Sequence, residues 1–275
     1  MKRAGVIGDP VDHSLSPIMH NAAFQELGIH VHYELWPTPA DQLMTRVNSV
    51  RDENVLGANV TVPHKQSVFD LVDATTATAD RVGAVNTIIP IGNGLLGDNT
   101  DVYGFTASLR ESAAVPQRAV LLLGAGGASR AVLVALGELG VSRIYVANRT
   151  EQRARGLVDE LGTVATQVLP VGDIPSMLGE IDLMINATSL GWHDDALPLP
   201  VDSFGQVEPG TVAMDLTYRD TAFLRAARGA GLRTIDGLGM LIHQGARSFA
   251  LWTGVEPPVE TMRAAVEAER ARRGG

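Results

Sequence analysis

The chain has 275 residues, enough for one large domain or two ordinary ones, each with its own hydrophobic core. Hydrophobic residues make up 45% and charged residues 19%, an ordinary globular balance, and the net charge of −9 disfavours nucleic acid as the main partner. The absence of cysteine excludes disulfides, thiolate metal sites and cysteine nucleophiles.

The amino-terminal segment "MKRAGVIGDP" has a basic start, but its apolar run is too short for a signal peptide. No stretch approaches the roughly 18 uninterrupted apolar residues of a membrane span. We therefore expect a cytoplasmic protein without a membrane partner. A monomer and a homodimer are both compatible with the sequence.

The first hundred residues alternate between strand and helix patterns. Ser16 before Pro17 is typical of a helix N-cap, and Gly92-Asn93 between two apolar runs is typical of a hairpin. The expected strands cover residues 4–8, 31–36, 55–62, 86–91 and 94–98. The expected helices cover residues 17–27, 40–50, 65–72 and 77–83.

A helix expected at 101–112 leads through the turn-rich segment 113–118 into a second series of strands and helices. Strands that alternate with helices imply parallel βαβ units and a doubly wound sheet. The fold class predicted is α/β, with two domains and a cleft between them. Further strands are expected at 119–124, 142–148, 164–170, 181–188 and 210–217. Further helices are expected at 127–140, 151–162, 239–254 and 259–273.

The segment "VLLLGAGGASRAVL" carries a glycine-rich loop between a predicted strand and a predicted helix. Gly124, Gly126 and Ser129 approximate the pattern G-x-G-x-x-[G/A]. Glycines at these positions let the backbone approach a pyrophosphate, which the N-terminal N–H groups of the next helix then bind. This loop predicts dinucleotide binding; the alternative is a tight strand–helix turn without a ligand.

The end of the next strand indicates which dinucleotide is bound. An NAD site usually has Asp or Glu there, whereas an NADP site has Arg close to the 2′-phosphate. This chain has no carboxylate at that place, and guanidinium groups match phosphate in geometry and charge. The alternative is that these arginines are solvated surface. The candidate residues are Asn148, Arg149, Thr150 and Arg153.

Polar residues gather at predicted strand ends in the first hundred residues, where open α/β sheets bind ligands. "NVTVPHK" carries a strand out of the core and places Lys65 directly after it, and Asp101 precedes a helix. Ser14 and Ser16, two residues apart beside a helix start, suit a carboxylate ligand. Taken singly, Ser16 and Asp101 could be helix caps, and Lys65 an ordinary lysine of a first helical turn.

Eight motifs in order give the chain a resemblance to the shikimate dehydrogenases over nearly its whole length. They are "HSLSPIMHNAAF" (13–24), "NVTVPHK" (59–65), "GAVNT" (83–87), "DNTDVYGF" (98–105), "GAGGASRA" (124–131), "NRT" (148–150), "NATSLG" (186–191) and "DGLGMLIHQGARSFALWTG" (236–254). A departure is Trp192-His193, where the family more often continues "GM".

The resemblance implies reversible, NADP-dependent reduction of 3-dehydroshikimate to shikimate, a step of aromatic amino-acid (chorismate) biosynthesis. It implies a substrate domain over residues 1–101, joined by C-terminal helices 239–275, and a Rossmann-like NADP-binding domain over 102–238. Hydride chemistry belongs to the nicotinamide, so no metal is expected. Alternatives are a quinate or aminoshikimate dehydrogenase of the same family, with NAD in place of NADP, and a non-catalytic NADP-binding regulator.

The resemblance also implies roles for individual residues. The implied catalytic pair is Lys65 and Asp101, in which Lys65 exchanges a proton with the reacting oxygen. The implied substrate contacts are Ser14, Ser16, Thr61, Asn86, Tyr218 and Gln244. The implied cofactor contacts are Gly124, Ala125, Gly126, Gly127, Ala128, Asn148, Arg149, Thr150, Arg153 and Met240.

Overall fold

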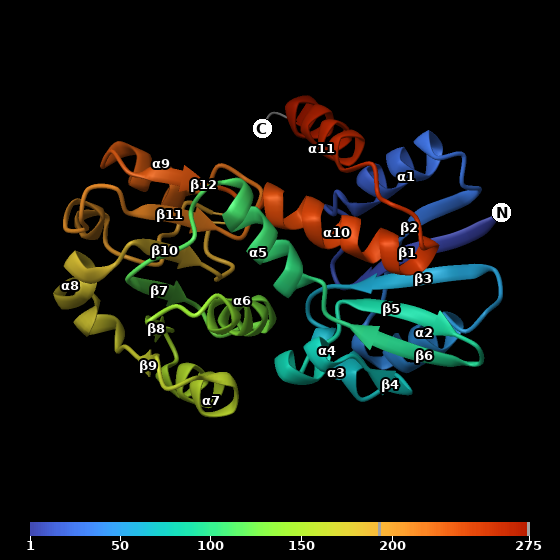
Figure 1. Cartoon of the computed structure of the whole chain (residues 1–275), viewed down its shortest axis with the longest axis horizontal. Helices are drawn as coiled ribbons and strands as arrows, with labels where there is room; N and C mark the ends of the chain where they lie inside the picture. Colours follow the sequence, from blue (N-terminus) through green and yellow to red (C-terminus); the bar gives the residue numbers. More distant parts are fainter. Residues whose placement is uncertain (192–193, 274–275) are drawn as a thin grey trace. The chain divides into compact units, whose positions relative to one another are not determined.

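The structure is a computed structural model that describes residues 1–191 and 194–273 (Figure 1). The chain forms two compact units, one of Met1–Gly104 with Leu241–Gly275 and the other of Phe105–Met240. Each unit contains a six-stranded sheet and its own hydrophobic core. Trp192-His193, the departure from the family pattern, lies outside the described residues.

The sheet of the first unit is mixed, with the strand order β2-β1-β3-β5-β6-β4. Strand β1 pairs in parallel with β2 and β3, whereas β5 pairs antiparallel with β3 and with β6, which confirms the hairpin predicted at Gly92-Asn93. The short strand β4, paired in parallel with β6, was not predicted. The strands are β1 (Lys2–Gly8), β2 (Val31–Pro37), β3 (Val55–Val60), β4 (Ala74–Thr75), β5 (Thr87–Ile91) and β6 (Gly94–Asp98).

The helix after β1 begins one residue earlier than predicted. Ser16 is its first residue, Leu15 occupies the N-cap position, and the cap has no side-chain hydrogen bond. The Ser14 hydroxyl instead accepts the Ser16 N–H, at 3.2 Å. The prediction that Ser16 caps this helix was therefore wrong. The helices with residues in this unit are α1 (Ser16–Glu26), η1 (Ala40–Gln42), α2 (Leu43–Ser49), α3 (Lys65–Phe69), α4 (Ala77–Val82), α5 (Asp101–Glu111), α10 (Leu238–Thr253) and α11 (Val259–Arg273).

Helix α10 packs closely on the middle of this sheet, on β3 and β5. The Trp252 indole Nε1 donates a hydrogen bond to the carbonyl oxygen of Ile88, at 3.0 Å. A Cβ atom at Gly57 would lie only 2.2 Å from the same Nε1, so glycine is required where the indole crosses β3. This close approach holds the polar residues of α10 near the strand ends.

The sheet of the second unit is parallel throughout, with the order β12-β11-β10-β7-β8-β9. The chain builds outward from β7 to β9, returns beside β7, and builds outward again to β12, which confirms the predicted doubly wound sheet. The strands are β7 (Ala119–Leu123), β8 (Arg143–Ala147), β9 (Thr166–Val168), β10 (Leu183–Asn186), β11 (Val212–Asp215) and β12 (Arg233–Ile235). The remaining helices are α6 (Gly127–Glu138), α7 (Glu151–Leu161), η2 (Val171–Asp173), α8 (Ile174–Met177), η3 (Leu178–Glu180), η4 (Val201–Gly205) and α9 (Ala222–Gly229).

The central strand β7, "AVLLL", is buried at every residue, as expected for a parallel strand covered on both faces. Strand β12 and helix α9 were not predicted. Strand β12 has only three residues, whereas α9 has a helical pattern that the sequence analysis missed, with Phe223, Leu224 and Ala227 buried on one face. Within residues 1–191 and 194–273, every helix is too short or too polar to cross a membrane.

Candidate active site

An ion pair at the edge of the first sheet forms the centre of the candidate site. Lys65 is the first residue of α3 and Asp101 the first residue of α5, and Lys65 Nζ lies 2.7 Å from Asp101 Oδ2. The two side chains are only 16% and 6% exposed. Because little water reaches this pair, its electrostatic interaction is stronger than that of a surface pair.

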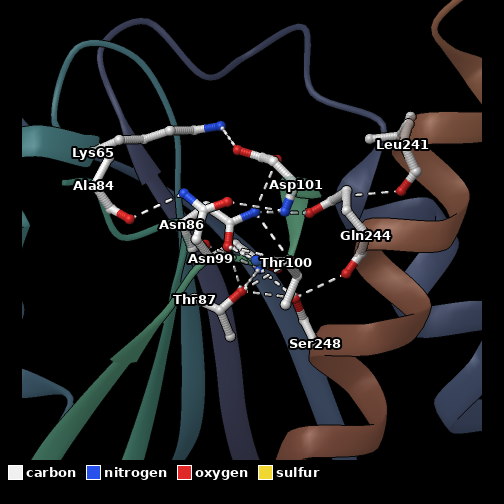
Figure 2. A network of polar contacts seen from close by, with 11 residues as sticks. Lys65, Ala84, Asn86, Thr87, Asn99, Thr100, Asp101, Leu241, Gln244 and Ser248 are labelled. Carbon is white, nitrogen blue, oxygen red and sulfur yellow. Dashed lines mark hydrogen bonds and ion pairs between the residues drawn. The ribbon is translucent and has the colours of Figure 1, made fainter. Parts of the chain in front are cut away.

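Asn86 orients the other oxygen of the same carboxylate (Figure 2). The backbone N–H of Thr100 donates to Asn86 Oδ1 at 2.8 Å, and a backbone N–H can only donate, so this contact fixes which end of the amide carries oxygen. Asn86 Nδ2 consequently faces Asp101 Oδ1, at 2.9 Å. Asp101 thus accepts hydrogen bonds at both oxygens, one from an ammonium group and one from an amide.

Helix α10, the second-last helix of the chain, contributes to the same cluster. Gln244 Oε1 lies 3.5 Å from Asn86 Nδ2, although the two residues are 158 positions apart in sequence, and Gln244 Nε2 donates to the Leu241 carbonyl at 2.9 Å. Figure 2 shows Gln244 facing Asn86 and Asp101 from the helix. The structure therefore brings together Lys65, Asn86, Asp101 and Gln244.

The predicted hydroxyl contacts lie at the same edge of the sheet. Ser14 follows β1, and Thr61 follows β3, the neighbouring parallel strand after which Lys65 also comes. Ser14 and Thr61 are half-buried and Ser16 is buried. Because parallel strands end at one edge, these hydroxyls and Lys65 share the edge where open α/β sheets bind ligands.

The glycine-rich loop of the second unit has room for a ligand beside its backbone. Gly124 has φ +113°, and a Cβ there would lie 2.9 Å from the Ala187 carbonyl oxygen, so only glycine fits. A Cβ at Gly126 or Gly127 would meet no atom within 4 Å. Packing therefore does not explain these two glycines, and the open space leaves room for a phosphate group to approach the start of α6. Ala125 and Ala128 complete the loop and are half-buried.

The residues predicted to contact the adenosine end follow β8, which lies directly beside β7. Arg149 and Arg153 are exposed, and neither forms an ion pair with any residue that the structure describes. Asn148 Nδ2 donates to the Thr150 carbonyl at 2.8 Å, which shapes the turn, and Thr150 is the N-cap residue of α7. Two unpaired guanidinium groups beside the glycine loop suit a phosphate group.

Two further predicted site residues lie in the second unit. Tyr218 is half-buried in the segment after β11, and Met240 is buried in the first turn of α10. The structure assigns both to the unit Phe105–Met240, whereas Gln244, one helical turn after Met240, belongs to the other unit.

The sequence interpretation missed a buried carboxylate beside the glycine loop. Asp215, at the end of β11, accepts hydrogen bonds from Asn186 Nδ2 and Thr221 Oγ1, both at 2.8 Å, and from the Thr217 N–H at 2.9 Å. Burial raises the pKa of Asp215, and these hydrogen bonds partly oppose the rise. Asn186 Oδ1 in turn accepts from Thr188, at 2.7 Å, so Asp215 fixes the loop that contacts Gly124.

The interpretation also missed Thr87 and Ser248, which lie beneath Asn86 in Figure 2. Ser248 is four residues after Gln244, so the two side chains lie on one face of α10. This spacing was a signal in the sequence that could have identified Ser248.

Comparison with known proteins supports one family for the whole chain. Family models match residues 6–88 ("Shikimate dehydrogenase substrate binding domain"), 108–191 ("Shikimate / quinate 5-dehydrogenase") and 237–267 ("Shikimate 5'-dehydrogenase C-terminal domain"). The shikimate dehydrogenase (NADP(+)) of Symbiobacterium thermophilum is 43% identical over an alignment of 270 positions, which covers 95% of this chain and 92% of that protein.

Solved structures agree in fold over the same length. The shikimate 5-dehydrogenase of Thermus thermophilus, in complex with NADP(H) and shikimate, has a TM-score of 0.88 and 40% identity, over 98% of this chain and 99% of that one. The quinate dehydrogenase of Corynebacterium glutamicum, in complex with NAD, has a TM-score of 0.89 and 32% identity, over 97% and 99%. With 43% identity to a relative over 95% of its length, the chain belongs to the shikimate dehydrogenase family.

Proposed function

We propose that this protein is an NADP-dependent shikimate dehydrogenase, which interconverts shikimate and 3-dehydroshikimate on the route to chorismate and the aromatic amino acids. The observation that carries the proposal is the shielded Lys65–Asp101 ion pair, with Nζ and Oδ2 2.7 Å apart, at the ligand-binding edge of the first sheet. The relatives named for this activity support the substrate and the cofactor.

Lys65 carries the proton transfer. When bound, NADP supplies the acceptor or the donor of the hydride. Reduction of the ketone builds negative charge on its oxygen, and the Lys65 ammonium group donates a proton to that oxygen; oxidation of the alcohol returns the proton to Lys65. The first-turn position on α3 fixes the base of this side chain, and Asp101 holds its end.

Asp101 and Asn86 keep Lys65 in position. The carboxylate attracts the ammonium group at Oδ2, while Asn86 Nδ2 holds Oδ1 at 2.9 Å, so the carboxylate cannot rotate freely. A preorganised donor of this kind need not reorient while charge develops, which is why such sites accelerate reactions.

The remaining polar groups of the first unit account for substrate recognition. Ser14 and Ser16 would hold the carboxylate of shikimate near the start of α1, where the helix N-terminus also favours negative charge. Thr61, Asn86 and Gln244 would contact ring hydroxyls, and Tyr218 is a further contact implied by the resemblance. We accordingly assign substrate binding to residues 1–101 with the C-terminal helices 239–275.

We assign NADP binding to residues 102–238, which cover nearly all of the second unit, Phe105–Met240. The backbone of Gly124–Ala128 would bind the pyrophosphate, and Arg149 with Arg153 would bind the 2′-phosphate, helped by Asn148 and Thr150. Met240 would line the nicotinamide side. Two observations fit the phosphate groups of NADP: the open space over Gly126 and Gly127, and the two unpaired guanidinium groups.

One set of initial rates tests the proposal: purified protein with shikimate or quinate, each with NADP⁺ or NAD⁺. The shikimate and NADP⁺ combination should be the fastest by a wide margin. Equal or faster rates with quinate would support the alternative of a quinate dehydrogenase, the activity for which the structural neighbour from Corynebacterium glutamicum is named. NADP⁺ binding without turnover of either substrate would support the non-catalytic regulator.

The proposal includes a cytoplasmic location, and a monomer or homodimer without nucleic acid or membrane as a partner. Light scattering on the purified protein distinguishes the monomer from the homodimer.

A further inference from the structure

A cluster of buried hydroxyl groups lies directly beneath the candidate catalytic residues. Thr87 and Ser248 are both 0% exposed and Thr100 is 1% exposed. Asn59, a buried amide, completes the cluster. Burial of so many polar side chains is costly unless their hydrogen bonds are made, so their arrangement requires a reason.

Ser248 is the member that joins the helix to the sheet. Its Oγ lies 2.8 Å from Thr87 Oγ1, 3.1 Å from Thr100 Oγ1 and 3.0 Å from Asn59 Nδ2. Its Oγ also lies 3.0 Å from the Gln244 carbonyl oxygen, on its own helix, so its single proton is donated either to that oxygen or to Thr87 Oγ1. Figure 2 shows the contacts of Ser248 with Thr87, Thr100 and Gln244, below Asn86.

Two neighbouring side chains of the sheet contact the Ser248 hydroxyl. Asn59 on β3 and Thr87 on β5 are directly opposite each other in the antiparallel register, so their side chains lie on one face. Asn59 Nδ2 lies 3.2 Å from Thr87 Oγ1, and the Tyr33 hydroxyl donates to Asn59 Oδ1 at 2.7 Å. The amide of Asn59 is thereby fixed, with its N–H groups directed toward Ser248 and Thr87.

The cluster continues into the candidate active site through Asn86. Thr87 Oγ1 donates to Asn86 Oδ1 at 2.9 Å, on the oxygen that also accepts the Thr100 N–H. The opposite end of this amide holds Asp101, and Gln244 lies one turn before Ser248 on α10. The cluster therefore contacts both Asn86 and the backbone that carries Gln244.

We propose that Ser248, acting with Thr87, is a positioning residue that sets Asn86 and Gln244 at the correct place for shikimate. The contacts of the Ser248 hydroxyl with Asn59 and Thr87 fix how far α10 lies from β3 and β5. The hydrogen bond from Thr87 to Asn86 Oδ1 then fixes the Asn86 amide relative to α10. This inference rests on the proposed function, and it assigns to Ser248 no contact with substrate.

The Thr100 amide provides a direct readout that does not depend on activity. Its N–H donates to Asn86 Oδ1, so hydrogen exchange at Thr100 reports whether Asn86 stays in place. Leu95, on the β5–β6 hairpin, is the internal control, and its N–H donates to Asp73 Oδ2. In Ser248→Ala, exchange at Thr100 should accelerate roughly tenfold more than at Leu95.

Thr253→Val is the matched control for the helix. Thr253 Oγ1 donates to the Phe249 carbonyl at 2.8 Å, the same backbone contact that Ser248 makes with Gln244, but Thr253 is not in the cluster. This variant should leave the exchange ratio of Thr100 to Leu95 unchanged. Thr87→Val removes a cluster hydroxyl at nearly constant volume, and Thr87→Ser keeps it.

Kinetics complete the test. With shikimate, kcat/KM should fall about tenfold in Ser248→Ala and in Thr87→Val, the scale of a small misplacement of site groups. The KM for NADP⁺ should stay unchanged, and Thr87→Ser should recover most of the loss. Equal acceleration of exchange at Thr100 and Leu95, or an unchanged kcat/KM, overturns the inference. A wild-type protein without shikimate activity would refute the proposed function, while the exchange experiment would still decide whether Ser248 positions Asn86.

Discussion

Replacing His20 by Phe is expected to make the folding of this protein less sensitive to acid. His20 is 0% exposed, its ring stacks on Tyr33 with centroids 4.4 Å apart, and the Trp252 ring lies 5.4 Å away. Neither ring nitrogen has a hydrogen-bond partner among the described residues. Burial lowers the pKa of His20 from 6.5 to about 3.

Proton linkage gives the direction and the size of the effect of pH on stability. Below pH 6.5 the unfolded chain protonates His20 while the folded chain does not, so stability is lost as the pH falls from 6.5 toward about 3. Each pH unit in that window costs about 1.4 kcal/mol. Between about pH 7.5 and pH 5, the loss assigned to His20 is therefore about 2 kcal/mol.

Denaturant unfolding of wild type and His20→Phe at both pH values measures this loss. Tryptophan fluorescence, to which Trp252 beside the imidazole contributes, follows the unfolding. Any packing cost of the larger ring is independent of pH, and the buried carboxyl of Asp215 contributes equally to both proteins, so the difference of the two pH effects isolates His20. Identical pH effects in the two proteins would refute the argument.

Three further predictions concern the cofactor, the substrate and the sheet. Arg149→Ala should raise the KM for NADP⁺ far more than that for NAD⁺; equal increases in steady-state assays would remove Arg149 from the phosphate site. Ser14→Ala should weaken shikimate binding, measured by calorimetry, by about 1–3 kcal/mol, with NADP⁺ binding as the unchanged control. Gly57→Ala should lower the free energy of unfolding by about 1–3 kcal/mol, because its Cβ would meet the Trp252 indole; unchanged stability in denaturant titrations would contradict the packing of α10.

Local sequence patterns predicted much of this fold. The unbroken apolar run of β7 and the Gly92-Asn93 turn each determine their structure within a few residues, so the doubly wound sheet and the hairpin could be predicted. Strand β4 has only two residues, Ala74 and Thr75, and depends on its partner β6. No local pattern marks such a strand.

The candidate site was less predictable because several of its contacts join distant segments. Lys65 and Asp101 could be proposed from their strand-end and helix-start positions and from the family motifs. The role of Ser248 depends on how α10 packs, since its contact with Asn59 spans 189 residues of sequence. Ser16 was assigned as an N-cap because the pattern before Pro17 suits one, but the Ser14 hydroxyl binds the Ser16 N–H instead.

Turnover of shikimate with saturating NADP⁺ in Lys65→Ala, relative to wild type, tests the central claim most directly. If Lys65 exchanges the proton with the reacting oxygen, kcat should fall by about 10²–10⁴-fold, the usual range for a positioned acid–base group. Shikimate affinity should change much less, because the largest charge that Lys65 meets exists only in the transition state. A folded Lys65→Ala protein with near-normal kcat would contradict the assignment of Lys65 as the proton donor and acceptor.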